Sequence, residues 1–304
     1  SVPAADLTPA HSGVDGLRRG RGPAGKRGRG DRRSRSSDAA EFFSGERSQQ
    51  MGLANVDVTI PPTHKLGQIE RPKGESGDPS KYFTVGQPLI FKSSDGFRSE
   101  LNRAIAKRPV GERKVLVFVH GYNTNFSDAV LRISQFVHDT GFKGVPVLFT
   151  WASRGKTIDY VYDINSALQA RFYLVELAHI LAKTNAEHFS IVSHSMGNLV
   201  TLEAMTALSL QRNFTPKGRL QSVILAAPDV HYDLFVEQLK NFKRLKPLIF
   251  VLVSKDDKAL SFSRSIAGGV SRVGSADPER LAALGLNIVD LSAIDDESSA
   301  NHSK

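Results

Sequence analysis

The 304-residue chain contains no cysteine. It therefore cannot form disulfides, use a thiolate nucleophile or bind zinc through sulfur. No apolar run approaches the roughly 18 to 20 residues that a bilayer-spanning helix needs. Because 40% of the residues are hydrophobic, the chain is still able to bury a core, which excludes a wholly disordered chain and a small stapled scaffold. We expect a soluble chain of one large or two modest domains.

Two nucleotide-binding motifs are also missing. No G-x-G-x-x-G follows a strand and no G-x-x-x-x-G-K-[ST] occurs, which excludes the dinucleotide fingerprint and the phosphate loop. Four histidines, His64, His138, His179 and His188, lack metal-ligand spacing or a partnering carboxylate pattern, so we expect them to be structural or surface residues. The sequence therefore predicts no cofactor and no metal.

Basic residues are concentrated at the N-terminus. Residues 1–35 hold nine Lys and Arg against three Asp, a net charge of +6, which leaves +3 for the other 269 residues. The run from 16 to 37 has almost no apolar content, so burial cannot offset the entropy of ordering it. We therefore expect residues 1–40 to form a disordered Arg/Gly/Ser-rich tail, either a solvated leader or linker or a weak contact for anionic surfaces. No aromatic residue is interleaved to stack a base, so no specific nucleic acid binding is expected.

The compartment stays open at this stage. The sequence begins without Met, and no apolar segment of a signal peptide follows the basic run. We expect a cytoplasmic protein or one exported after removal of a signal. The sequence makes no prediction of oligomeric state.

From about residue 55, short apolar runs alternate with longer segments of helical period, a pattern typical of βαβ units and a mostly parallel sheet. The runs predict strands at 56–60, 115–119, 146–150, 189–193, 222–227, 248–253 and 287–291. The segments between them predict helices at 94–107, 127–140, 163–185, 196–211, 231–242 and 278–284. Near-continuous Val, Ile and Leu in several strands indicates that both sheet faces are covered. The predicted fold is a three-layer α/β/α sandwich, with a single domain over residues 41–304.

The strongest local feature is a buried strand, a tight turn with Ser195 at its tip, and a helix: FSIVS, HSMGN, LVTLEAMTALSL. This order is typical of a nucleophile elbow, in which the serine hydroxyl projects from the strand end. The turn is crowded, so its flanking residues must be small. Here they are Ser193 and Gly197, which gives S-x-S-x-G where G-x-S-x-G is usual. The alternative is that Ser195 merely caps the helix.

A serine nucleophile needs a base and an acid. In folds that carry a nucleophile elbow, these residues follow the serine in the chain order Ser, acid, His. Only His231 and His302 come after Ser195. His231 is a poor candidate because the acid nearest to it, Asp229, is just two residues away. His302 leaves room for a buried strand that ends in two carboxylates, Asp256 and Asp257.

Six segments together resemble the α/β-hydrolase superfamily, and specifically a bacterial esterase-like family long described only as a domain of unknown function. They are VLVFVHGYNTNFSDAVLR, VPVLFTWASRG, IVSHSMGN, AAPDV, SKDDKAL and a late NHS. The resemblance covers about residues 40 to 304. It implies that the acid is the Asp of D-x-A-L, Asp257, and that the base is the His of the terminal H-S pair, His302. Asp256 is the second candidate for the acid.

The resemblance also assigns a role to H-G-Y, which follows the central strand VLVFV. It implies that the backbone N–H groups of Tyr122 and Met196 form the oxyanion hole. Gly121 allows close backbone approach. His120 precedes Ser195 in the chain and is expected to brace this loop rather than to act as the base.

Other residues near the predicted strand ends have expected roles. Asn123 and Asn125 are expected to satisfy backbone groups in the oxyanion loop, and the alternative is that either orients a substrate. Trp151, Tyr160 and Tyr162 lie just past a strand end, where a pocket wall and core packing are equally good interpretations. Asp163 is expected to begin the following helix as its N-cap.

The predicted activity is that of a serine hydrolase, a carboxylesterase that cleaves short- to medium-chain acyl esters of a small-molecule substrate. The connection of about 20 residues between the strands SVILAA and LIFVLV fits one helix, so we expect no large lid and a site open to water. Two alternatives remain. The same triad could serve acyl transfer or amide cleavage, or the fold could be a non-catalytic binding platform tethered by its basic tail.

Overall fold

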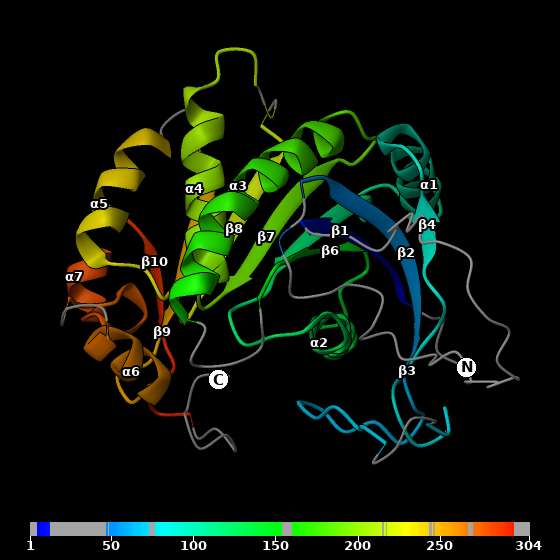
Figure 1. Cartoon of the computed structure of the whole chain (residues 1–304), viewed down its shortest axis with the longest axis horizontal. Coiled ribbons are helices and arrows are strands. Elements are labelled where there is room, and N and C mark those ends of the chain that lie inside the picture. The colour runs from blue at the N-terminus through cyan, green and yellow to red at the C-terminus, as the bar shows by residue number, and fades with distance from the viewer. Residues whose placement is uncertain are drawn as a thin grey trace, which may run out of the picture.

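A ten-stranded sheet forms the middle layer of the molecule (Figure 1). The structure is a computed structural model that describes residues 5–12, 47, 49–72, 77–153, 160–214, 216, 218–242, 245, 247–266 and 270–294. The strand order is β10-β9-β8-β7-β5-β6-β1-β2-β3, with β4 paired to β2. Neighbouring strands from β1 to β10 along this order are parallel, whereas β2 pairs antiparallel with β1, β3 and β4.

The strands are β1 (Ala5–Ser12), β2 (Met51–Thr59), β3 (Thr84–Val85), β4 (Leu89–Phe91), β5 (Lys114–Val119), β6 (Val145–Trp151), β7 (His188–His194), β8 (Leu220–Ala226), β9 (Leu248–Val253) and β10 (Asn287–Asp290). The helices are α1 (Ser94–Ala106), α2 (Phe126–Asp139), α3 (Tyr160–Ala182), α4 (Gly197–Leu210), α5 (Tyr232–Asn241), α6 (Lys258–Ile266) and α7 (Pro278–Ala282), with a short 3-10 turn at Val273–Ser275. Each predicted strand and helix is present, with ends that differ by a few residues.

Strand β5 shows why the molecule has three layers. Successive side chains of a strand point to opposite faces of the sheet. Val115, Val117 and Val119 pack in one buried cluster with residues of α1, α3 and α4. Leu116 and Phe118 belong to a second cluster with residues of α2. Both faces of the strand are therefore covered, and the prediction of a mostly parallel α/β/α sandwich is confirmed.

Helix α2 begins at a residue suited to a helix start. Asn125 is the N-cap of α2, and its side chain accepts a hydrogen bond from Asp128 N at 2.8 Å. This contact satisfies one of the free N–H groups of the first turn. Asp163 differs from its prediction. It lies in the first turn of α3 and is fully buried, and its Oδ2 accepts a hydrogen bond from Ser153 Oγ at 2.7 Å.

Strand β1 is a further difference from the sequence analysis. Residues 5–12 fall within the predicted disordered tail, but the structure pairs them with β2 on one side and β6 on the other. The tail prediction depended on the composition of the Arg/Gly run, which these residues precede. Their partners lie some 40 to 140 positions away, so local composition carries no sign of the pairing. Residues 13–46, the rest of the predicted tail, lie outside the described residues.

Helix α6 and strands β3 and β4 were not expected either. The two strands have two and three residues, and α6 has nine. Such segments are too short for hydrophobic periodicity to distinguish them from loops. Within the described residues, no helix combines the length and hydrophobicity that a bilayer-spanning segment needs.

Candidate active site

Ser195 lies in the tight turn between β7 and α4. Its φ of 53° is in the left-handed region, which costs a residue with a side chain about 1–2 kcal/mol. Its N–H donates to Ala226 O at 3.0 Å, and its carbonyl accepts from Asn198 N at 3.1 Å. Strain of this kind persists only where the surrounding structure holds it. The turn is therefore a fixed feature in which β8 holds the end of β7.

Asn198, in the first turn of α4, stabilises the Ser195 turn through its side chain. Its fully buried side chain donates from Nδ2 to Ser195 O and to Ala226 O, both at 2.9 Å. Its Oδ1 accepts a hydrogen bond from Ser193 Oγ at 2.7 Å. Ser193, which replaces the usual glycine of the motif, therefore fixes the side-chain amide of Asn198, and that amide stabilises the Ser195 turn. Asn198 was not predicted as a site residue, although it directly follows Gly197 in the motif.

Two glycines bring the central loop against the turn. A Cβ at Gly197 would lie 2.4 Å from His120 O, and a Cβ at Gly121 would lie 2.8 Å from the Cβ of Ser195. Real Cβ atoms do not approach that closely, so both positions need glycine. The backbone after β5 consequently packs directly on Ser195.

The Ser195 hydroxyl is buried, with the residue 2% exposed. No hydrogen-bond partner for its Oγ is found among the described residues. The backbone N–H groups of Tyr122 and Met196 likewise have no acceptor in the part of the chain that the structure describes. The Gly121 loop packs against the Ser195 side chain.

His120 is held on every side. Its Nδ1 lies 2.7 Å from Gly121 O, its Nε2 accepts from Trp151 N at 3.1 Å, and its ring stacks on the indole of Trp151. Trp151 Nε1 also donates to His120 O at 2.8 Å. Burial lowers the pKa of His120 to about 4, so the ring is neutral at neutral pH. This geometry fastens the loop after β5 to the end of β6.

The two candidate acids lie in different surroundings. Asp257, which follows β9, is buried, and its Oδ1 accepts a hydrogen bond from Leu260 N at 2.9 Å. Asp256 is exposed and accepts a hydrogen bond from Ser254 Oγ. Burial and the charges of Asp229, Asp163 and Asp257 raise the pKa of the Tyr122 phenol. The Asp257 carboxylate therefore lies within electrostatic reach of the loop that packs on Ser195.

The candidate bases are placed unequally. His302 lies outside the described residues. His231 is the N-cap of α5 and pairs with Arg272 through an isolated β-bridge. Burial and the Arg272 charge lower the pKa of His231.

A buried polar network next to the turn was not predicted as a unit. Asp229 donates from its backbone N to Ser195 O at 3.3 Å. Its carboxylate accepts hydrogen bonds from Tyr160 OH at 2.8 Å and Ser263 Oγ at 2.5 Å, and forms an ion pair with Arg272 Nε at 3.2 Å. Tyr160 in turn packs edge-on against the ring of Tyr122. The network links the backbone of the serine turn to α3 and α6.

A cavity of about 960 Å³ extends from this loop along the α2 face of the sheet. One end is formed by the loop residues 120–124, and the side wall is formed by residues of α2. Its sheet wall consists of Phe118, Val192, His194, Ile224, Ala226, Phe250, Leu252 and Val289. The cavity is thus mainly apolar along the sheet, with one imidazole, and begins at the loop that carries Tyr122. In the described residues of the connection between β8 and β9, the chain forms helix α5 and no second helix.

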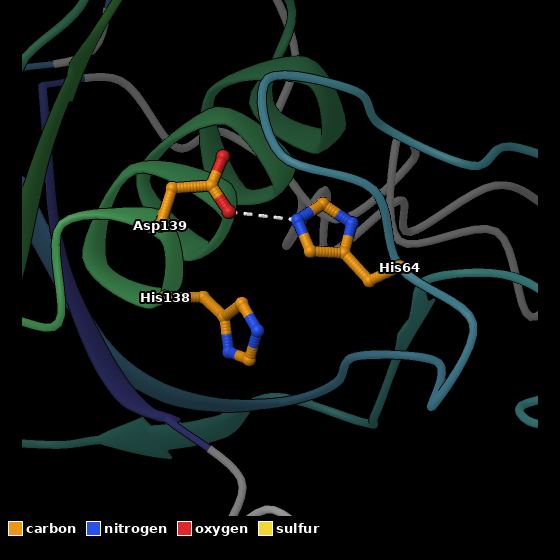
Figure 2. A group of neighbouring side chains, drawn as sticks. All are labelled: His64, His138 and Asp139. Carbon is orange, nitrogen blue, oxygen red and sulfur yellow. Dashed lines mark hydrogen bonds and ion pairs between the residues drawn. The ribbon is translucent and has the colours of Figure 1, made fainter.

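A second cluster of titratable side chains lies at the C-terminal end of α2. His64, His138 and Asp139 come together there (Figure 2). The sequence analysis found no carboxylate partner for His64, but Glu70 and Asp139 each place an oxygen 2.8 Å from one of its ring nitrogens. Asp139 is 75 positions away from His64 along the chain. Spacing along the sequence therefore gave no signal for this cluster.

A family model matches most of the chain. The family model described as "Alpha/beta hydrolase of unknown function (DUF900)" matches residues 93–304. A comparison with curated proteins finds no match. Among solved structures, phospholipase PlaB from Legionella pneumophila aligns at 14% identity and a TM-score of 0.32, over 54% of this chain and 45% of that one. The same phospholipase in complex with thio-NAD aligns at 16% and 0.33, over 54% and 44%. The chain thus spans less than half the length of that phospholipase.

Proposed function

The chain belongs to the family of alpha/beta hydrolases of unknown function, DUF900, and on this premise we propose that it is a serine carboxylesterase. Ser195 is the nucleophile, His302 the general base and Asp257 the acid that orients it. The observation that carries the proposal is the strained Ser195 turn, with its φ of 53° and a buried hydroxyl that has no hydrogen-bond partner among the described residues. Strain at a residue of this kind is typical of functional sites.

The reaction begins when Ser195 Oγ attacks the ester carbonyl carbon and its proton passes to His302. The carbonyl oxygen becomes an oxyanion that accepts hydrogen bonds from the backbone N–H groups of Tyr122 and Met196. The intermediate collapses to an acyl-enzyme, and the alcohol leaves with the proton from His302. Water activated by the same histidine then attacks the acyl-enzyme and releases the acid.

Asp257 is favoured over the other acids by its surroundings. It is buried, whereas Asp256 is exposed. Asp229 lies close to Ser195, but its carboxylate is engaged by Arg272, Tyr160 and Ser263. A carboxylate neutralised by a buried guanidinium is a poor partner for an imidazolium, because its charge is already compensated.

The cavity beside the Tyr122 loop supports an acyl ester as substrate. Its volume of about 960 Å³ is within the range of small-molecule pockets, which are lined mainly by apolar side chains. Hydrolysis of short- to medium-chain acyl esters fits this mainly apolar sheet wall.

The test is hydrolysis of p-nitrophenyl esters from acetyl to palmitoyl by the full chain. Ser195→Ala and His302→Ala should each reduce kcat/KM by about 10⁴-fold or more. Ser134→Ala is the matched control, because Ser134 is also a buried serine but donates to Val130 O within α2. Asp257→Asn should lose more activity than Asp256→Asn.

The outcomes separate the possible assignments. Activity that survives Ser195→Ala would overturn the proposal. Activity lost in Ser195→Ala but kept in His302→Ala would move the base to His231. Product analysis with an added alcohol distinguishes hydrolysis from acyl transfer.

A further inference from the structure

The cluster at the C-terminal end of α2 joins two segments that are far apart in the chain. His64 lies in the loop that follows β2, and His138 and Asp139 are the last two residues of α2. One potential ligand atom from each of the three lies within 4.8 Å of the others. Figure 2 shows the Asp139 carboxylate facing the His64 ring, with His138 beside both.

The two nitrogens of His64 have distinct partners. Its Nδ1 lies 2.8 Å from Glu70 Oε2, and the other oxygen of Glu70 accepts from Lys65 N at 2.9 Å. Metal-binding histidines usually donate their second ring N–H to a carboxylate, which fixes the tautomer and the ring orientation. With Nδ1–H directed at Glu70, Nε2 faces Asp139 Oδ1 at 2.8 Å, so a metal ion would replace the proton between these two atoms.

Asp139 is oriented in the same manner. Its Oδ2 accepts hydrogen bonds from Gly67 N at 2.8 Å and from Gln135 Nε2 at 2.6 Å. Its Oδ1 is left to face His64. The side chain of His64 is 5% exposed and that of Asp139 is 9% exposed. The carboxylate is therefore nearly dehydrated but held by two donors, a state that suits a cation ligand.

His138 is the third member. Its ring centroid lies 5.2 Å from that of His64, and the two rings meet edge to face. Within the described residues, the His138 ring nitrogens have no hydrogen-bond partner. The cluster also lies at the C-terminal end of α2, where the helix dipole favours positive charge.

We propose that His64, His138 and Asp139 bind a divalent transition-metal ion of the Zn²⁺ class. The ligands are His64 Nε2, Asp139 Oδ1 and one ring nitrogen of His138, a donor set of two imidazoles and one carboxylate that suits Zn²⁺ and leaves a fourth position for water. Glu70 and Gln135 orient the ligands from the second layer.

The ion would link two segments that are far apart in the chain. It fastens the loop 61–70 to α2, and Gly67 of this loop lines the cavity. The site lies at the opposite end of α2 from Asn125, a helix of 14 residues that spans about 20 Å. It is therefore distinct from the Ser195 site, and its test does not depend on the proposed esterase activity.

The experiment uses the full chain without an affinity tag, freed of metal by a chelator. Calorimetric titration with ZnCl₂ should show one equivalent bound by the wild type. His138→Gln should weaken binding at least about 10-fold, and Glu70→Gln should weaken it by about 10- to 100-fold. His179→Gln is the matched control, because His179 also lies in the last turn of a helix, α3, but lies against Gln211. It should bind as the wild type does.

A second measurement does not depend on the variants folding. Co²⁺ in place of Zn²⁺ should give visible d–d absorption bands in the wild type at one equivalent, and ZnCl₂ should abolish them. The proposal is overturned if the wild type takes up neither ion, or if folded His138→Gln and Glu70→Gln bind Zn²⁺ as tightly as the His179→Gln control. The cluster would then be only a protonated His64 that donates hydrogen bonds to the carboxylates of Glu70 and Asp139.

Discussion

Two covered histidines on either side of helix α2 have opposite electrostatic properties. His120 precedes α2 and is 3% exposed, and the side chain of His64, at the other end of the helix, is 5% exposed. The pKa of His120 is lowered to about 4. The pKa of His64 is raised, because hydrogen bonds to Glu70 and Asp139 outweigh the effect of burial. Both side chains are largely covered, yet their charge preferences are opposite.

The difference arises from depth and from the partners of each ring. His120 lies deep in the fold, where desolvation dominates, and its nitrogens meet a backbone carbonyl and a backbone N–H. A neutral imidazole satisfies both, since it has one donor and one acceptor. His64 meets two carboxylates, which a neutral ring cannot satisfy together. The loop beside the serine thus holds a neutral imidazole, whereas the far end of α2 favours a positively charged one.

The largest expected effect concerns a buried carboxylate that loses its charged partner. Arg272→Met leaves Asp229 unpaired, with side-chain exposures of 5% and 1% in the original pair. Breaking a buried pair from one side costs about 3–5 kcal/mol, which urea unfolding at neutral pH measures. The control Arg171→Met breaks the more exposed pair with Glu203 and should cost less than about 1 kcal/mol.

A double variant sharpens this test. Asp229→Asn combined with Arg272→Met should recover part of the stability lost by Arg272→Met alone, because no buried charge then remains unpaired. Equal losses of unfolding free energy in Arg272→Met and Arg171→Met would show that the charge of Arg272 does not stabilise the buried Asp229.

The second effect is a pH dependence that comes from His120. Its pKa is about 4 in the folded chain and about 6.5 when unfolded. The unfolded state therefore binds more protons between these values, and stability falls as the pH falls from 6.5 to 4. The difference of about 2.5 units corresponds to about 3 kcal/mol.

His120→Gln removes this proton uptake. The variant is less stable than the wild type at pH 7, because it loses the stacking on Trp151 and the ring contacts. The gap between the two should narrow as the pH falls toward 4, as measured by urea unfolding at several pH values. A gap that stays constant for His120→Gln would contradict a neutral, buried His120.

The fold could be predicted because its signals are local. The run 248–253 was expected as a strand and is β9, and 94–107 was expected as a helix and is α1. Short apolar runs and helical periods each report on one element at a time. The same local signals predicted the tight turn at Ser195 and Gly197, because an elbow is a strand, a turn and a helix in succession.

The contacts that arrange the sites could not be predicted, because they join distant segments. Tyr160 and Asp229 are 69 positions apart, and Tyr160 and Arg272 are 112 apart. The partnership of His64 with Asp139, like the pairing of β1 with β6, depends on where the sheet order places the segments. Nothing in the composition around those residues records it.

The smallest expected effect concerns Ser193, whose hydroxyl makes a neutral hydrogen bond next to the Ser195 turn. Its hydroxyl donates to Asn198 Oδ1 at 2.7 Å in a fully buried position, and it fixes the amide whose Nδ2 binds Ser195 O. Ser193→Ala leaves that acceptor unpaired and should lower the free energy of unfolding by about 1–2 kcal/mol. Activity toward p-nitrophenyl esters should fall only a few-fold, because Asn198 Nδ2 keeps its contact with Ala226 O. Ser222→Ala, which removes a hydroxyl pair with Ser190 on neighbouring strands, is the control for a lost serine hydrogen bond away from the turn. A loss of activity in Ser193→Ala as large as that in Ser195→Ala would mean that Ser193 does more than hold Asn198, since a neutral hydrogen bond behind the turn cannot account for it.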